Sequence, residues 1–170
     1  KRTEFLAEFS QVFQSYYELL SLGREVVTLS YKASVREGDM LSALRASFER
    51  DRIMTYTTTG VHRDDILLNI GDYPVKKIGS QGQKKTFLIA LKLAQYAWLH
   101  RMSGVKPLLL LDDIFDKLDA DRVNQIVTIV SGDVFGQVFI TDTNREHIDD
   151  ILKLQHTEYK LFKVEQGEIL

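Results

Sequence analysis

The chain has 170 residues, 44% hydrophobic and 27% charged, which is enough for one sizeable core. It has no cysteine, which excludes a disulfide framework and cysteine-based catalysis or metal binding, and its net charge of −2 gives no global basic field for nucleic acid. No apolar run approaches the ~20 residues that span a bilayer. The first residues are neither an initiator methionine nor a signal peptide, so we expect part of a longer chain.

The first half of the chain predicts two helices and two β elements. Apolar residues recur at three- and four-residue steps from Phe5 to Leu20, which indicates an amphipathic helix that Gly23 is placed to end. Residues 26–35 predict a strand rich in Val, Thr and Tyr. Asp39 is suited to cap a second helix, which carries Leu41, Leu44 and Phe48 on one face. Residues 66–70 and 75–78 predict a hairpin around a Gly-Asp turn.

The second half alternates helices and strands, which predicts an α/β sheet. The uninterrupted apolar run at residues 107–111 is typical of a central parallel strand covered on both faces. A long helix over residues 83–102 is expected to turn Phe87, Leu91, Ala94 and Trp98 inward. The other expected elements are helices at 119–130 and 144–152, a strand at 137–141 and a terminal hairpin of 159–164 with 168–170 around Gly167.

A glycine-flanked loop, Gly79-Ser80-Gln81-Gly82-Gln83, stands directly before the long helix. Glycines let the backbone approach a ligand closely, and a helix N-terminus presents unpaired N–H groups and a positive dipole end. Ser80 adds a hydroxyl donor, so the loop is a candidate anion site, with phosphate the commonest candidate. The alternative is a loop and helix cap that binds nothing.

Two carboxylates, Asp112 and Asp113, follow the apolar strand at its carboxyl end, where open α/β sheets bind ligands. One of them can hold Mg²⁺ and the other can polarise a water molecule as a general base. Helix capping and loop solvation are the alternative. A further acidic segment, residues 116–119, ends at Asp119, which is a good N-cap for the next helix and can combine that with a functional role.

The order of these segments is more specific than any one of them, and it resembles the second half of an ABC-type ATPase head. The resemblance narrows to the RecF family through residues 48–52, 55–57 and 60–65, together with 80–83, 90–94 and 110–113. It runs from about residue 40 to the C-terminus. The fold class implied is α/β, the C-terminal half of an ABC-type P-loop ATPase head, with an N-terminal helical arm remnant and a small antiparallel hairpin.

The resemblance implies a role for each motif. Ser80, Gln81, Gly82 and Gln83 form the signature motif, which would contact the γ-phosphate of ATP held by a partner subunit. Asp112 would support Mg²⁺, Asp113 would be the general base, and Asp119, in the D-loop, would lie across the dimer interface. A division of the chain into 1–35, 36–78 and 79–170 follows from this assignment.

Three positions depart from the wider pattern. Most ABC proteins have Glu where this chain has Asp113, although RecF proteins resemble it there. Many ABC ATPases place a phosphate-sensing His directly after the last core strand. In this chain residues 141–143 at that place are Thr-Asp-Thr, with no His among them. Val61 stands where RecF usually has Pro. Beside it, His62 and Arg63 are candidate phosphate or DNA contacts, the alternative being a surface turn paired with Asp64 and Asp65.

The phosphate-binding loop itself, Gly-x-x-x-x-Gly-Lys-Ser/Thr, does not occur in these residues. We therefore expect the P-loop to come from a preceding segment of a longer protein. The resemblance implies a bacterial cytoplasmic protein of DNA repair and replication that dimerises on ATP, binds DNA at single-strand gaps and acts with RecO and RecR. The alternatives are a non-catalytic dimerisation or partner-docking module and the head of another SMC-type or transporter ATPase; the lack of a membrane segment argues against a transporter.

Overall fold

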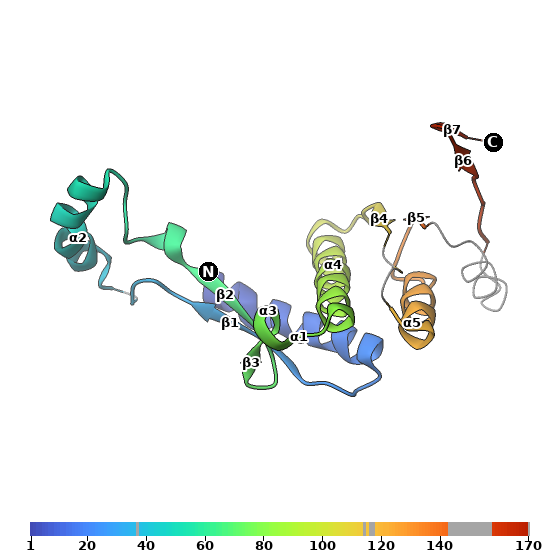
Figure 1. The fold of residues 1–170 in the computed structure, drawn as a ribbon, viewed down its shortest axis with the longest axis horizontal. Helices are drawn as coiled ribbons and strands as arrows, with labels where there is room; N and C mark the ends of the chain where they lie inside the picture. Colours follow the sequence, from blue (N-terminus) through green and yellow to red (C-terminus); the bar gives the residue numbers. More distant parts are fainter. Residues whose placement is uncertain (37, 114, 116–117, 143–157, 170) are drawn as a thin grey trace. The chain divides into compact units, whose positions relative to one another are not determined.

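The computed structural model describes residues 1–36, 38–113, 115, 118–142 and 158–169, and Figure 1 labels the helices and strands that they form. The chain divides into two compact units, residues 1–94 and 95–170, and the boundary falls inside the longest helix. The three-part division at residues 35 and 78 stays a prediction. In the described ranges, no helix is both long and apolar enough to cross a membrane.

The first unit begins with α1 (Arg2–Ser21), which packs on a three-stranded antiparallel sheet of order β1-β2-β3. The other elements of this unit are β1 (Val27–Lys32), α2 (Met40–Met54), the 3-10 turn η1 (Val61–Arg63), β2 (Asp65–Ile70), β3 (Tyr73–Pro74), α3 (Val75–Ile78) and the first part of α4 (Gln81–Ser103). β1 and β2 pair along their whole length, from Val27 opposite Ile70 to Lys32 opposite Asp65.

The core of this unit lies under α1. Phe13, Tyr17 and Leu20 are buried on one side of the helix. The predicted amphipathic helix is thus present, with Tyr17 buried in place of the predicted Tyr16, which is half-buried. The predicted stop is confirmed: Leu22 and Gly23 both adopt positive φ, and the Gly23 N–H donates to the Glu18 carbonyl oxygen at 3.0 Å. This left-handed termination satisfies a carbonyl group that the helix leaves free.

The hairpin prediction is wrong for residues 75–78. Only Tyr73 and Pro74 pair with β2, and Val75–Ile78 form the single helical turn α3. Pro74 has no N–H to donate to a continuing ladder. The helical turn instead buries the Val75 side chain and lets the Gly79 N–H donate to the Val75 carbonyl oxygen at 2.9 Å.

The helix α4 confirms the predicted long helix, although its burial is broader than one stripe. Phe87 and Ala94 are buried as expected, whereas Leu91 and Trp98 are only half-buried. Further positions around the helix are also buried, namely Ile89, Ala90, Leu93 and Tyr96. A helix buried over so much of its circumference belongs to the interior of the fold.

The second unit contains a parallel pair of strands, β4 (Leu109–Asp112) and β5 (Val138–Thr141), and the helix α5 (Ala120–Val130). Both strands and α5 lie where the sequence predicts them. α5 buries its apolar side through Val123, Ile126, Val127 and Val130. Tyr96 and Phe135 pack together with ring centroids 4.7 Å apart, and the Tyr96 hydroxyl accepts a hydrogen bond from the Gly136 N–H.

The expectation that β4 is covered on both faces is wrong for the described residues. Leu109 and Leu111 are buried, but Leu108 and Leu110 on the opposite face are 63% and 70% exposed. Phe139, directly opposite Leu110 in the register, is also exposed. Successive side chains of a strand point to opposite faces, so one face of this two-stranded sheet is an open apolar surface.

The C-terminal hairpin is confirmed in a shorter form. β6 (Val164–Glu165) pairs with β7 (Glu168–Ile169), and Gln166 and Gly167 turn between them with positive φ. The helix predicted at residues 144–152 lies outside the described residues.

Candidate functional site

The glycine-flanked loop closes as a reciprocal cap on α4. The Ser80 Oγ accepts from the Gln83 N–H at 3.1 Å, and the Gln83 Oε1 accepts from the Ser80 N–H at 2.8 Å. This is a capping box, which satisfies two of the donors that a helix N-terminus leaves free. The capping alternative is therefore observed, but the Ser80 hydroxyl keeps its own proton for donation to an anion. The phosphate role stays a prediction.

The two glycines and Gln81 have separate positions in this loop. A Cβ on Gly79 would lie 2.7 Å from the Val75 carbonyl oxygen, so this glycine is required by a close approach of α3 rather than of a ligand. Gln81 is exposed as the first residue of α4, and the Gly82 carbonyl oxygen accepts from the Thr86 hydroxyl at 2.8 Å. The first turn of α4 is thus held by the capping box between Ser80 and Gln83 and by the bond from Thr86 to Gly82.

The two carboxylates lie at the carboxyl ends of the parallel strands. Asp112 is the last residue of β4 and stands opposite Thr141, the last residue of β5. The Thr141 hydroxyl donates to the Asp112 carboxylate, and the Asp113 N–H lies 3.1 Å from the Thr141 carbonyl oxygen and 3.2 Å from its Oγ. The sequence pattern missed Thr141 as a partner, although the parallel pairing of the two predicted strands would have placed it beside Asp112.

Asp113 has a left-handed backbone, with φ of 46°. Asp is one of the few side chains that tolerate this conformation. It turns the chain sharply at the end of β4, and both Asp112 and Asp113 are exposed to solvent. Mg²⁺ is usually bound by one or two protein carboxylates with water and substrate phosphates, and this exposed pair fits that donor set.

Asp119 caps α5 as predicted. Its carboxylate accepts from the Arg122 N–H at 2.9 Å, and the Arg122 Nε lies 3.7 Å from the other carboxylate oxygen. Its place across a dimer interface stays a prediction. Asp116 and Lys117 of the same motif lie outside the described residues.

His62 and Arg63 are exposed in η1 and contact the preceding segment. The His62 Nε2 lies 3.0 Å from the Thr57 carbonyl oxygen, and the Arg63 guanidinium lies over the Tyr56 ring at 5.5 Å. The alternative pairing with Asp64 and Asp65 is not the arrangement found, because Asp64 binds other residues. A phosphate or DNA contact by His62 and Arg63 stays a prediction.

Asp64 ties together three separate segments of the first unit. Its carboxylate accepts from the Ser34 N–H at 2.9 Å, from the Tyr31 hydroxyl and from the Arg2 guanidinium at 2.8 Å. The Ser34 N–H, followed by the Tyr31 hydroxyl, lowers the pKa of Asp64 to about 2. The ordinary value for Asp is about 3.9, so the folded state favours the charged carboxylate.

Replacing Asp64 by Asn is expected to lower the melting temperature at neutral pH. A carboxylate whose folded pKa is depressed stabilises the fold above its unfolded pKa, and loses this effect as pH falls through the folded value. The gap between wild type and Asp64→Asn is therefore expected to narrow as pH falls from about 4 towards about 2. Thermal unfolding across this range tests it, with Asp65→Asn as a control because the Asp65 carboxylate accepts locally, from the Ile66 N–H at 2.8 Å. A pH-independent gap would contradict this role.

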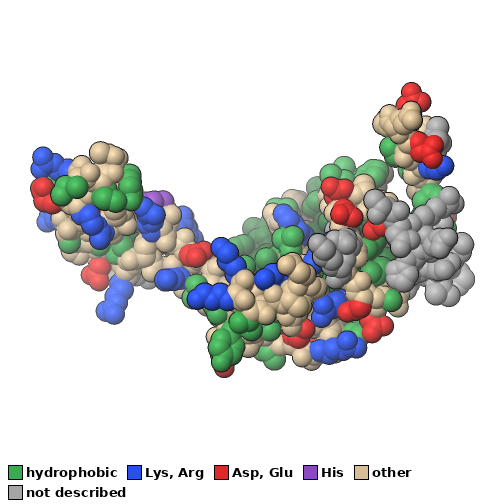
Figure 2. Space-filling model, viewed as in Figure 1, with side chains coloured by type: hydrophobic (Ala, Val, Ile, Leu, Met, Phe, Trp, Pro, Cys, Tyr) green, Lys and Arg blue, Asp and Glu red, His purple; other side chains and the backbone are tan. Residues whose placement is uncertain are grey.

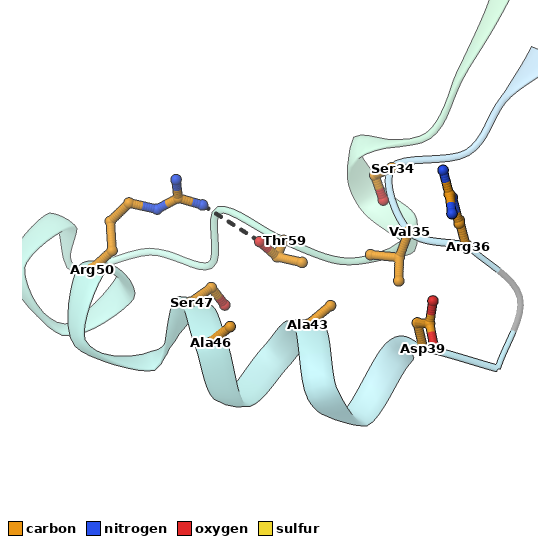
Figure 3. Close-up of a pocket in the computed structure, with 9 residues that line it drawn as sticks. All are labelled: Ser34, Val35, Arg36, Asp39, Ala43, Ala46, Ser47, Arg50 and Thr59. Carbon is orange, nitrogen blue, oxygen red and sulfur yellow. Dashed lines mark hydrogen bonds between the residues drawn. The ribbon is translucent and has the colours of Figure 1, made fainter.

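Lysine, arginine and histidine side chains gather over the part that contains α2 and η1, as Figure 2 shows. Arg50 donates to the Thr58 Oγ through Nε at 2.9 Å and Nη2 at 2.6 Å, while Arg52 pairs with Glu49. Arg50 also lines a hollow of about 470 Å³ beside α2, with Arg36 at the opposite end (Figure 3). These arginines remain exposed, in keeping with a solvated helix face, but Arg50 is also tied to a loop.

The same fold is found in solved ATPase heads. A structure from work on ATP-driven dimerization and DNA stimulated activation of SMC ATPases matches 100% of this chain and 87% of its own, with a TM-score of 0.56 at 15% identity, which speaks for the fold alone. The recombination mediator protein RecF in its RecF-ATPrS form matches 99% of this chain and 44% of its own, with a TM-score of 0.72 at 25% identity. The RecF-ATP form gives 0.67 at 27% identity, over 85% of this chain and 40% of its own.

The chain therefore has the α/β fold of an ABC-type ATPase head. No protein-family model matches it. The DNA replication and repair protein RecF of Phocaeicola vulgatus is 56% identical over 170 residues, and that of Bacteroides thetaiotaomicron is 54% identical over 169 residues. Each match covers 99% of this chain and 46% of the relative, so the chain spans just under half the length of these relatives. The chain belongs to the RecF family and corresponds to the C-terminal part of its members.

Proposed function

We propose that this chain supplies the signature, Walker B and D-loop parts of an ATP site in a RecF protein of DNA repair and replication. One observation carries the proposal: Asp112 and Asp113 stand together at the carboxyl end of β4, joined to the end of β5 through Thr141. Ligands of open α/β sheets bind at this edge. The resemblance to RecF in an ATP-bound form identifies ATP as the ligand to test.

In this proposal each side chain has one task. Asp113 accepts the proton of the water molecule that attacks the γ-phosphorus, while the bond to the leaving ADP oxygen breaks. Asp112, oriented by the Thr141 hydroxyl, would hold Mg²⁺, which would neutralise phosphate charge. Ser80 and Gln83 donate hydrogen bonds to the γ-phosphate of ATP held by a second subunit, and Gly82 lets the loop approach it. Asp119 contacts the partner across the interface.

The P-loop would come from a segment outside these 170 residues. The open apolar face of β4 and β5, with Leu108, Leu110 and Phe139 exposed, supports this arrangement. Exposed apolar surface of this kind is ordinarily covered by another layer of secondary structure. A P-loop lobe packed on this sheet would cover it and bring the nucleotide to the carboxyl end of β4.

The partners follow from the same assignment. ATP would join two RecF subunits, because a signature loop and a P-loop from different subunits are both needed to surround the γ-phosphate. DNA at single-strand gaps would be the nucleic-acid ligand, with His62 and Arg63 as contacts, and RecO and RecR the protein partners. The protein would act on bacterial DNA in the cytoplasm.

ATP titration separates this function from a docking module. The 170-residue chain alone is expected to show no ATP turnover and no micromolar affinity for ATP with Mg²⁺, because it has no P-loop. A RecF polypeptide that contains these residues together with a P-loop is expected to bind ATP and hydrolyse it slowly. Isothermal titration and phosphate release measure both. Micromolar binding by the 170 residues alone would contradict the divided site, and a longer protein that binds without any turnover would favour the non-catalytic module.

A further inference from the structure

The carboxylate of Glu25 lies between a buried tyrosine and the loop at the start of α4. Glu25 is half-buried in the segment between α1 and β1. One of its oxygens accepts from the Tyr17 hydroxyl, and the other accepts from the Gln83 Nε2 at 3.1 Å. Since the Gln83 Oε1 accepts from the Ser80 N–H, a continuous series of hydrogen bonds runs from Tyr17 through Glu25 and Gln83 to Ser80.

This series fixes the orientation of the Gln83 amide. A glutamine amide has a donor end and an acceptor end, and an ionised carboxylate can only accept. Glu25 therefore selects the NH₂ end of Gln83, which leaves the Oε1 end for the Ser80 N–H. One of the two N–H groups is used on Glu25, and the second is a donor available to a ligand. Hydrogen bonds to an ionised partner are about twice as strong as neutral ones.

The tyrosine that donates to Glu25 is packed in the core of the first unit. Tyr17 is fully buried, and its ring lies 6.1 Å from Phe13 and 5.6 Å from Phe87, measured between centroids. Phe87 is four residues beyond Gln83 on α4, so it lies one turn along the same side of that helix. The start of α4 is therefore joined to α1 in two ways: by ring packing at Phe87, and by hydrogen bonds through Glu25 at Gln83.

We propose that Glu25 is a positioning residue for the signature loop. It acts through Gln83, holding that amide so that the Ser80 backbone and hydroxyl groups, together with the free Gln83 N–H, keep the arrangement that receives the γ-phosphate. This role rests on the proposed function, because the proposed function is what assigns the γ-phosphate to the signature loop as its ligand. Neither Glu25 nor Tyr17 belongs to the motif itself, so the role comes from the fold and not from the motif pattern.

Substitutions of Glu25 in a RecF polypeptide that includes the P-loop test the proposal. Glu25→Ala is expected to weaken ATP-driven dimerisation and to lower turnover by roughly tenfold to a hundredfold, the range for losing a hydrogen bond to a charged group. ATP affinity of the monomer is expected to stay nearly unchanged. Glu25→Gln is expected to restore most of the activity, because its carbonyl oxygen can still accept from Gln83. Ultracentrifugation with and without ATP, phosphate release and nucleotide titration give the three readouts.

A second carboxylate gives a matched control. Asp51 accepts from the Thr58 N–H at 3.0 Å and from the Ser47 hydroxyl at 3.1 Å, so Asp51→Asn disturbs a comparable network without touching the loop. Equal losses of dimerisation in Glu25→Ala and Asp51→Asn would overturn the positioning role and indicate general destabilisation. If Glu25→Ala does not fold, Tyr17→Phe tests the role instead, because it removes only the hydroxyl that donates to Glu25. Weaker ATP-driven dimers in Tyr17→Phe would support the positioning role, and normal dimers would overturn it.

A substitution in the signature loop itself, Ser80→Arg, distinguishes the role of Glu25 from the proposed function. Lost dimerisation in Ser80→Arg with normal behaviour in Glu25→Ala would overturn the role of Glu25 and leave the proposed function standing. Normal dimers in both variants would overturn the proposed function itself.

Discussion

Asp113→Asn is expected to lower ATP turnover of the P-loop-containing RecF protein by ~10²-fold or more, the scale of general-base catalysis, while ATP still binds. Asn has nearly the shape of Asp but cannot take the proton of the attacking water. The backbone turn is expected to survive, because the Asp113 contacts to Thr141 are made by its N–H. Asn also tolerates the left-handed φ at this position. The chemistry is thereby removed without loss of the fold.

Single-turnover phosphate release and ATP titration of the same variant measure these two effects separately. Asp133→Asn is a suitable control, since Asp133 is exposed in the loop before β5 and it is the Asp133 backbone carbonyl oxygen that accepts from Lys106. A normal hydrolysis rate in Asp113→Asn would show that the base is another residue. Reduced ATP affinity instead of reduced turnover would place Asp113 in nucleotide binding.

Local patterns predicted the elements that carry the site. The start of α4 and the cap of α5 follow from short-range chemistry, since Ser80 and Gln83 are three residues apart and Asp119 caps the turn that follows it. The same is true of the end of α1 at Leu22 and Gly23. Each of these features depends on residues that are neighbours in the chain, so periodicity and capping rules were sufficient to find them.

Features that depend on distant residues were not found from the sequence. Residues 75–78, Val-Lys-Lys-Ile, begin and end with β-branched residues that suit a strand, but pairing stops at Pro74 and the buried contact of Val75 favours a helical turn. The bond between Thr141 and Asp112 joins residues 29 positions apart. The link from Glu25 to Gln83 spans 58 positions. A single sequence gives no direct signal for such pairs, whereas a paired register or a packed helix brings them together.

The coverage of β4 was mispredicted for a related reason. Four leucines in succession are typical of a strand buried on both faces, and the pattern does not say which segment covers each face. Leu109 and Leu111 are buried within the described residues, while Leu108 and Leu110 are exposed. One face of β4 is therefore covered in these residues and the other is open, and the proposed P-loop lobe is the layer that would cover the open face.

Ser80→Arg is expected to abolish ATP-driven dimerisation and turnover of the P-loop-containing protein, while each monomer keeps its affinity for ATP. In the proposed arrangement the signature loop closes over the nucleotide of a second subunit, so only the dimer surrounds the γ-phosphate from both sides. ATP then stabilises the dimer in proportion to its preference for that state. Arginine at position 80 adds bulk and charge at this contact, and leaves the P-loop of its own subunit untouched.

The capping box adds a second effect that the experiment has to separate from the first. Ser80→Arg also removes the side chain that caps α4, and loss of such a cap costs about 0.5–2 kcal/mol of stability. Ser80→Ala removes the cap without the bulk, and Ser80→Thr keeps a capping hydroxyl. If the contact is with a partner's nucleotide, dimerisation measured by ultracentrifugation falls far more in Ser80→Arg than in Ser80→Ala and persists in Ser80→Thr. Similar dimer losses in the Arg and Ala variants, matched by similar drops in melting temperature, would attribute the effect to the helix cap.

Intact ATP-driven dimers in Ser80→Arg would exclude the loop as a clamp on the partner's nucleotide. Lost affinity of the monomer for ATP would place Ser80 in the nucleotide site of its own subunit.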